Sequence, residues 1–253
     1  MKHNRTLVLD IGNRFAKIYV VDDDALGGEW RFQSGNPTWF DRLESIAINS
    51  GCENSVIVSV IPELTEIAQS RIESVGIGTV VVTYDIDLPI VIDYGSPKRL
   101  GADRIADSVG AFEFYGDIAD SLIVVDAGTA ITVDLVRDGK FLGGAIIPGL
   151  KMMTDSLHSG TAQLPAADSK IKPQFPGKAT EQCISAGAIS AAVGAIEFLW
   201  RKLTAKAKSK KLIMTGGDAK ILTEYIDIEY IDDPLLLVKG AVAILDNLMD
   251  GNR

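Results

Sequence analysis

Two short apolar runs in the sequence each end in the pattern Asp-x-Gly. Leu7-Val8-Leu9 continues into Asp10-Ile11-Gly12-Asn13, and Ile123-Val124-Val125 continues into Asp126-Ala127-Gly128-Thr129. The glycine lets the backbone come close to a phosphate, and the aspartate can hold a hydrated cation on that phosphate. Taken alone, the first pattern favours an ordinary tight turn, whereas the second, which adds threonine hydroxyls, favours a functional turn. Two such turns facing each other could clamp one triphosphate.

A third pattern, Gly101-Ala102-Asp103-Arg104, stands at the start of a predicted helix. The free amides in the first turn of a helix favour an anion. A carboxylate there can accept a proton from a substrate hydroxyl, and an adjacent guanidinium can hold a substrate carboxylate. The alternative is a helix cap with a surface ion pair, and the pattern by itself favours that alternative.

A fourth pattern, Thr215-Gly216-Gly217-Asp218-Ala219, lies between a predicted strand and a predicted helix. Paired glycines there suit an adenosine lying against the chain, and an ordinary turn with Asp218 as helix N-cap fits equally well. The sequence patterns of P-loop kinases, Rossmann dehydrogenases and serine hydrolases are absent, so these classes lack support.

The elements that must position these patterns occur twice in the same order. Each half opens with three predicted strands, and the Asp-Gly turn at residues 137–140 is a strong hairpin signal. The first hairpin is expected to turn within residues 22–28. The remaining predicted elements follow the helical and strand periodicities: helices at 39–48, 62–75, 105–115, 180–203, 219–225 and 235–248, and strands at 55–60, 79–83, 212–214 and 226–231.

The repeated order β-β-β-α-β-α predicts an α/β fold of two homologous lobes with a cleft between them. We expect the boundary near residues 116–121, which gives lobes of residues 1–118 and 119–253. The alternative is coincidence, since Asp-x-Gly after a strand is common, but the repeated three-strand meander favours duplication.

Composition narrows the class of protein. The chain has 253 residues and a formal net charge of -9, which argues against non-specific binding to nucleic acid or to an anionic membrane. Cys52, Cys183 and the two histidines offer no disulfide framework and no His-rich zinc site. We expect no signal peptide and no stretch approaching about 18 uncharged apolar residues, and therefore a cytoplasmic protein.

These patterns, taken together and in order from Leu7 to Leu248, resemble the type III pantothenate kinases, which belong to the actin, sugar kinase and Hsp70 superfamily. No single block is decisive, but the ordered set is highly specific. Besides the four patterns above, the matching blocks are Tyr94-Gly95-Ser96-Pro97, residues 143–150, Thr161-Ala162-Gln163-Leu164-Pro165, Thr180 ahead of Gly187, and Lys239-Gly240.

The resemblance implies two actin-like, ribonuclease H-like lobes around a central ATP cleft, and an enzyme that phosphorylates pantothenate with ATP in the first step of coenzyme A synthesis. It implies Asp103 as general base and Asp126 as the ligand of a monovalent cation, K⁺ or NH₄⁺, with Mg²⁺ accompanying ATP. The resemblance assigns pantothenate contacts to Tyr94, Gly101, Ala102, Arg104 and Thr180, and ATP contacts to Asp10, Ile11, Gly12, Asn13, Arg14, Phe15, Ala16, Lys17 and Thr129.

The resemblance also implies a homodimer in which Thr180 reaches the pocket of the other subunit. The predicted helix at 180–203 has small side chains that would allow close approach of a second helix, and its apolar faces carry Ile184, Ala188, Ala191, Ala192, Ala195 and Ile196. From the residues alone, burial of this helix inside the second lobe is the preferred alternative, and the resemblance reverses that preference.

One residue departs from the family pattern: Arg14 stands where a threonine or serine is usual. The arginine could contact phosphate or could point to solvent, and we favour the second interpretation slightly. A non-catalytic, nucleotide-binding regulatory relative and a kinase acting on a sugar or acetate are the competing hypotheses. The three aspartates Asp10, Asp103 and Asp126 argue against the former, and residues 94–104 argue against the latter.

Overall fold

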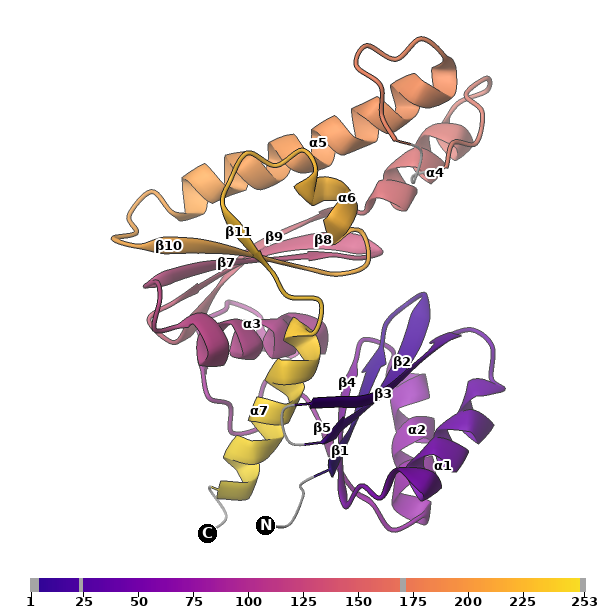
Figure 1. Ribbon diagram of the computed structural model, residues 1–253, viewed down its shortest axis with the longest axis vertical. Coiled ribbons are helices and arrows are strands. Elements are labelled where there is room, and N and C mark those ends of the chain that lie inside the picture. The colour runs from indigo at the N-terminus through magenta and orange to yellow at the C-terminus, as the bar shows by residue number, and fades with distance from the viewer. Residues whose placement is uncertain (1–4, 23–24, 169–171, 251–253) are drawn as a thin grey trace. The chain divides into compact units, whose positions relative to one another are not determined.

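The computed structural model describes residues 5–22, 25–168 and 172–250, which form two compact units, each built on its own sheet (Figure 1). The first unit comprises residues 1–114, 139–141 and 235–253, and the second comprises residues 115–138 and 142–234. The sequence-based boundary at 118/119 lies close to the first change of unit, but helix α7 at the C-terminal end groups with the first unit rather than with the second.

In the first unit, helices cover both faces of a mixed five-stranded sheet of order β3-β2-β1-β4-β5. Strand β1 pairs antiparallel with β2 and parallel with β4, and its side chains are buried on both faces, as its nearly continuous apolar sequence predicts. One face packs against α1 and α2, and the other against α3 and α7. The elements are β1 (Arg5–Ile11), β2 (Phe15–Asp22), β3 (Ala25–Gln33), α1 (Trp39–Ser50), β4 (Asn54–Ser59), α2 (Pro62–Ser74), β5 (Gly78–Val81), β6 (Val91–Ile92), the 3-10 helix η1 (Pro97–Arg99), α3 (Ala102–Tyr115) and α7 (Leu236–Asp250).

In the second unit the same connectivity recurs. The sheet has the order β11-β10-β7-β8-β9, and β6 adds to the outer edge of β9. Strand β7 pairs antiparallel with β8 and parallel with β10, as β1 does with β2 and β4. The predicted duplication of the α/β unit is therefore confirmed. The elements are β7 (Ser121–Ala127), β8 (Ala130–Arg137), β9 (Lys140–Pro148), α4 (Leu150–Gly160), α5 (Thr180–Leu203), β10 (Lys210–Thr215), α6 (Ala219–Thr223) and β11 (Tyr230–Asp232).

Several predicted elements differ from the structure. Strand β3 begins at Ala25, so the first hairpin turn is shorter than the predicted 22–28, of which residues 23–24 lie outside the described part. The register between β2 and β3 shifts between Val20 and Val21. Beyond this shift the two strands stay paired as far as Asp22 and Ala25. The predicted strand at 226–231 is reduced to Tyr230–Asp232. Helix α4 and the two-residue β6 were not predicted. Of the 11 residues of α4 only Leu150 and Thr154 are buried, and β6 is too short to show a strand periodicity.

Helix α5 begins and ends where the sequence predicted, but one expectation about it was wrong. Its length and composition would suffice to cross a membrane, although no such stretch was expected. The apolar side chains of α5 belong to the core of the second unit. Those that pack on the sheet include Ile184, Ala188, Ala192 and Ile196. Of the six residues expected on an exposed apolar face, these four are therefore buried, whereas Ala195 is half-buried and Ala191 is exposed. The exposed residues of α5 include Gly187, Ala191 and Gly194.

The crossing of α3 and α7 in the first unit depends on two glycines. A Cβ on Gly240 would overlap the carbonyl oxygen of Ala106, and a Cβ on Gly110 would lie 2.5 Å from the carbonyl oxygen of Leu236. The two helix backbones are thus in direct contact, which no larger residue permits. This contact holds α7 in the core of the first unit beside α3.

We predict that Gly240→Ala lowers the free energy of unfolding by about 3 kcal/mol, because the added methyl group must push two backbones apart. Urea denaturation measures this value. The matched control is Gly35→Ala, in an exposed turn where a Cβ would meet no atom within 4 Å, and it should change stability by less than about 1 kcal/mol. Equal effects of the two substitutions would contradict the close helix crossing.

Candidate active site

The first Asp-x-Gly turn joins β1 to β2 and is held by three hydrogen bonds. The Gly12 amide donates to the Phe15 carbonyl oxygen at 3.0 Å, and the Ser34 hydroxyl donates to the Gly12 carbonyl oxygen at 2.6 Å. The Ser34 amide donates to the Arg14 carbonyl oxygen at 3.1 Å. The turn is thus fixed in position by the residue that follows β3.

Charged side chains lie in one row across the three strands behind this turn. The register places Lys17 opposite Asp10 on one side and opposite Arg31 on the other. Lys17 Nζ donates to Asp10 Oδ2 at 2.8 Å, and the two side chains are 32% and 14% exposed. A partly exposed carboxylate and ammonium beside a tight glycine turn are groups that can receive a magnesium-bound phosphate.

Arg14 and Arg31 both lie near the ring of Phe15. The Arg31 guanidinium carbon is 3.7 Å from the ring centroid, and that of Arg14 is 5.2 Å away. Both arginine side chains are exposed. The sequence did not single out Arg31, since only the strand register shows that it lies beside Lys17.

Tyr19 follows Lys17 on the same face of β2, and its ring is buried. Burial raises the pKa of Tyr19 to about 12, while the nearby Lys17 lowers it and Asp10 raises it by smaller amounts. The hydroxyl therefore stays protonated at neutral pH. Tyr19 is not suited to act as a general base.

A second group of predicted residues gathers where α3 begins. Asp103 lies in the first turn, where its Oδ1 accepts a hydrogen bond from the Arg104 amide at 2.8 Å. A Cβ on Gly101 would overlap the same Oδ1, so glycine at 101 leaves room for the carboxylate. Ala102 is buried, and the Arg104 side chain is only 6% exposed. The helix thus presents a carboxylate beside a buried cation.

Val60 contacts both groups of predicted site residues in the first unit, the turn after Asp10 and the start of α3 at Asp103. The Val60 amide donates to the Ile11 carbonyl oxygen at 3.1 Å, at the end of β1. The Val60 side chain lies 3.8 Å from the position that a Cβ on Gly101 would take. The turn after Asp10 and the helix start at Asp103 therefore lie at the same edge of the first sheet.

In the second unit, the loop after β10 packs against Asp126 at the end of β7, and the start of α4 packs against the turn that follows Asp126. Gly216 has φ +92°, and a Cβ on it would overlap Asp126 Oδ1 and lie 2.6 Å from the Ala127 carbonyl oxygen. The Asp218 amide donates to that carbonyl oxygen at 2.9 Å, and the Gly149 amide donates to the Thr129 carbonyl oxygen at 3.1 Å. The glycines thus let backbone oxygens and one carboxylate come together around the second turn.

This set of donors fits a weakly charged cation better than a transition metal. Among the described residues, no group of three or more His, Cys, Asp or Glu side chains could hold a metal ion. Potassium and ammonium need carbonyl and carboxylate oxygens rather than a charged cluster. The Asp126 carboxylate and the nearby backbone carbonyls are oxygen atoms of that kind, and the carbonyl oxygens of Ala127 and Thr129 already accept hydrogen bonds from the Asp218 and Gly149 amides.

Thr180, the last predicted site residue, is the first residue of α5 and is exposed. It belongs to the second unit, whereas Tyr94, Asp103 and Arg104 belong to the first.

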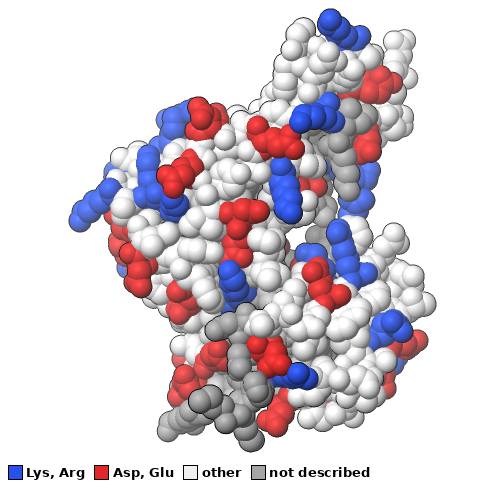
Figure 2. All heavy atoms as spheres, viewed as in Figure 1, with Lys and Arg blue, Asp and Glu red and all other residues white. Residues whose placement is uncertain are grey.

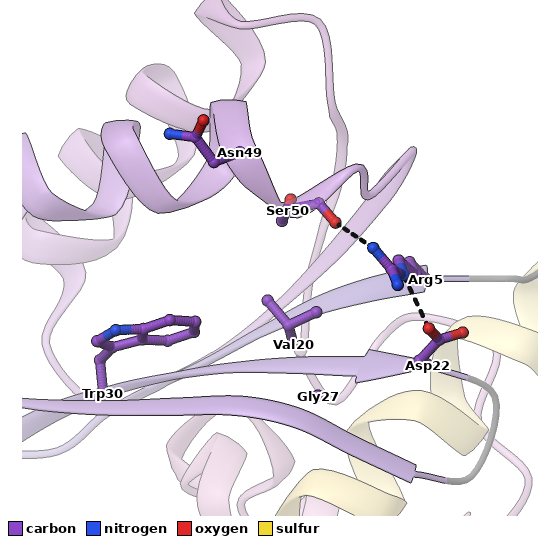
Figure 3. Close-up of a pocket in the computed structure, with 7 residues that line it drawn as sticks. All are labelled: Arg5, Val20, Asp22, Gly27, Trp30, Asn49 and Ser50. Atoms are coloured by element: carbon purple, nitrogen blue, oxygen red, sulfur yellow. Dashed lines mark hydrogen bonds and ion pairs between the residues drawn. The ribbon is translucent and has the colours of Figure 1, made fainter.

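The cavity in Figure 3 is not this site. It has a volume of about 180 Å³ and lies where Arg5 begins β1 and Asp22 ends β2, whereas Asp10 and Lys17 lie toward the opposite ends of these strands. Arg5 Nε donates to Asp22 Oδ2 at 2.8 Å, and another guanidinium nitrogen donates to the Ser50 carbonyl oxygen at 3.3 Å. These bonds join β1 and β2 to the end of α1, and their exposure makes the ion pair weak.

The duplicated α/β fold is the actin-like fold, which solved structures of several kinases share. The crystal structure of a ROK hexokinase from Thermus thermophilus shares the fold, with a TM-score of 0.57, 11% identity, and coverage of 98% of this chain and 100% of that chain. The class predicted from the duplicated lobes is therefore confirmed at the level of fold.

Sequence comparisons narrow the class further. The family model of the type III pantothenate kinases matches residues 6–202. A type III pantothenate kinase of Fervidobacterium nodosum is 33% identical over 229 residues, covering 87% of this chain and 90% of that protein. One of Thermosipho africanus is 30% identical over 251 residues, covering 96% and 98%. The chain belongs to the type III pantothenate kinase family and is a phosphotransferase, as predicted.

Proposed function

We propose that this protein transfers the γ-phosphoryl group of ATP to the hydroxyl of pantothenate, giving 4′-phosphopantothenate in the first step of coenzyme A synthesis. Family membership over most of the chain supports this proposal. The observation that carries it in the structure is Asp103 in the first turn of α3, followed directly in sequence by the buried Arg104, whose guanidinium lies near the ring of Tyr94. A base and a carboxylate ligand stand together there, as a hydroxy acid substrate requires.

In this mechanism Asp103 takes the proton from the substrate hydroxyl as its oxygen attacks the γ-phosphorus. A new O–P bond forms, the bond from the γ-phosphorus to the β,γ-bridging oxygen breaks, and ADP leaves with the electron pair. Arg104 and Tyr94 hold the carboxylate at the opposite end of the substrate from the reacting hydroxyl. Gly101 and Ala102 contact the substrate as well. Positioning and charge stabilisation supply most of the acceleration in such transfers.

The two Asp-x-Gly turns would serve the nucleotide. Residues 10–17 would contact the phosphates from the first unit, and Thr129 from the second. Magnesium would neutralise phosphate charge when bound, with Asp10 as a ligand through water. The Lys17 ammonium, now on Asp10, would then be available to a phosphate oxygen. Arg14 and Arg31, exposed at the same turn, could take part in that contact.

The competing hypotheses are a nucleotide-binding regulator without activity and a kinase for another substrate. The retained carboxylates and the family match argue against the first, and the tyrosine and arginine beside Asp103 argue against the second. We also propose a cytoplasmic location and no nucleic acid or membrane partner. In keeping with the latter, basic and acidic side chains of the described residues are interspersed over the face in Figure 2.

We predict that Asp103→Asn folds normally but loses about 10²- to 10⁴-fold in turnover, because an amide cannot accept the proton. Steady-state kinetics with ATP and pantothenate measures the loss. Glu63→Gln is the matched control, an exposed acidic residue in the first turn of α2, and it should keep wild-type turnover. An unchanged turnover of Asp103→Asn would remove this residue from the mechanism.

We predict ATP consumption that needs pantothenate as well as K⁺ or NH₄⁺. The chain has no P-loop lysine, so a cation at Asp126 would supply positive charge during transfer. The assay offers pantothenate, a hexose or acetate, each in buffers of potassium or sodium alone. Asp126→Asn should lose the potassium response. Full activity in sodium, after careful removal of potassium, would contradict the cation site, and consumption with hexose or acetate alone would contradict the substrate.

We further propose a homodimer in which Thr180 completes the pocket of the partner subunit. Thr180 is exposed at the start of α5, and small residues such as Gly187, Ala191 and Gly194 on the exposed part of this helix permit close approach of a second helix. In a symmetric dimer each of the two equivalent pockets would then be completed in trans.

Mixing two inactive variants tests this arrangement. In a heterodimer of Asp103→Asn and Thr180→Arg, one pocket collects both changes and the other is intact. We predict recovery of about a quarter of wild-type activity after random exchange, since half of the dimers are mixed and each has one working pocket. No recovery despite confirmed subunit exchange would mean that Thr180 serves the pocket of its own chain or none.

A further inference from the structure

We propose that Phe141, a residue of β9 that no sequence pattern singled out, is a positioning residue for recognition of the substrate carboxylate. Its ring, together with that of Tyr94, holds the guanidinium of Arg104 in the orientation that binds the carboxylate. The inference rests on the proposed function, because it concerns the same pocket of the first unit.

Arg104 lies close to two aromatic rings that contact each other. Its guanidinium carbon is 5.3 Å from the ring centroid of Phe141 and 5.8 Å from that of Tyr94. The two rings meet edge to face, with centroids 5.6 Å apart and planes at 70°. A guanidinium within about 6 Å of an aromatic face is attracted by the ring quadrupole, more strongly when water is excluded. The three side chains therefore form one packed group.

A short strand pairing places both rings. Ile92 of β6 pairs with Phe141 of β9, and the Asp93 amide donates to the Phe141 carbonyl oxygen at 3.0 Å. That bond fixes the chain directly before Tyr94. The Phe141 side chain is fully buried, in the same core cluster as Ile105 and Val109 of α3. Phe141 is thus tied both to the helix that carries Arg104 and to the segment that carries Tyr94.

This packing matters because an arginine side chain has many rotamers, and restricting them costs entropy. The rings restrict Arg104 when the protein folds, so the substrate carboxylate meets an arginine that is already oriented. An aromatic face attracts the guanidinium without using any of its N–H donors. The arrangement should favour an acid over a neutral analogue of the same shape.

The test compares pantothenate with its carboxamide analogue, in which the carboxylate is a neutral amide. Phe141→Leu removes the ring and keeps a buried apolar side chain. The matched control is Phe112→Leu, because Phe112 packs on the same core cluster, where its ring meets Gly139. We expect Phe141→Leu to lower the acid-to-amide ratio of kcat/KM about tenfold, equivalent to roughly 1.4 kcal/mol. The change should appear in KM for pantothenate, with kcat and KM for ATP within about twofold of wild type.

Phe112→Leu should leave the ratio unchanged, and Phe141→Tyr, which keeps the aromatic face, should restore it. Site-specific pentafluorophenylalanine at 141 keeps the ring shape but reverses its quadrupole, and should lower the ratio even if the leucine variant folds poorly. An acid-to-amide ratio that is the same in wild type and in the folded ring variants would overturn the inference. A wild-type enzyme inactive on pantothenate would instead overturn the proposed function.

Discussion

The parallel pairing of the central strands is the constraint on which the site depends. In the first sheet β1 pairs with β4, and in the second β7 pairs with β10, with Asp126 directly opposite Thr215. Because parallel strands end at the same edge, the loop after β4 and the loop after β10 arrive beside the Asp-x-Gly turns. Val60 thereby connects the first turn to Gly101, and Gly216 packs on Asp126. The duplicated topology thus produces two acidic turns with similar surroundings.

The two units share one topology but carry different chemical groups at the ends of their strands. The first adds a helix start at which Asp103 lies beside the buried Arg104, and so offers a base and an anion ligand. In the second, Gly216 packs against the Asp126 carboxylate and the Ala127 backbone. The duplicated fold therefore carries different side chains at equivalent turns, while each sheet keeps its own core.

The sequence predicted features that depend on local pattern. It predicted both three-strand meanders, the Ala-rich helix α5 with its limits, and the turn residues, because periodicity and glycine signals are local. It did not predict the 11-residue α4 or the two-residue β6, or the packing of α7 beside α3, which depends on a contact between Gly110 and Gly240 far apart in sequence. Arg31 and Phe141 were missed for the same reason, since only strand register places them beside Lys17 and Arg104.

The most direct measurement of the central claim is phosphorus-31 nuclear magnetic resonance of the wild-type protein with MgATP, potassium and pantothenate. We predict a new phosphomonoester resonance that grows in step with ADP, while inorganic phosphate stays low. The product should then be identified as 4′-phosphopantothenate by its mass. ADP accompanied only by inorganic phosphate, or no ADP at all from a folded protein, would contradict the claim that this chain is a pantothenate kinase.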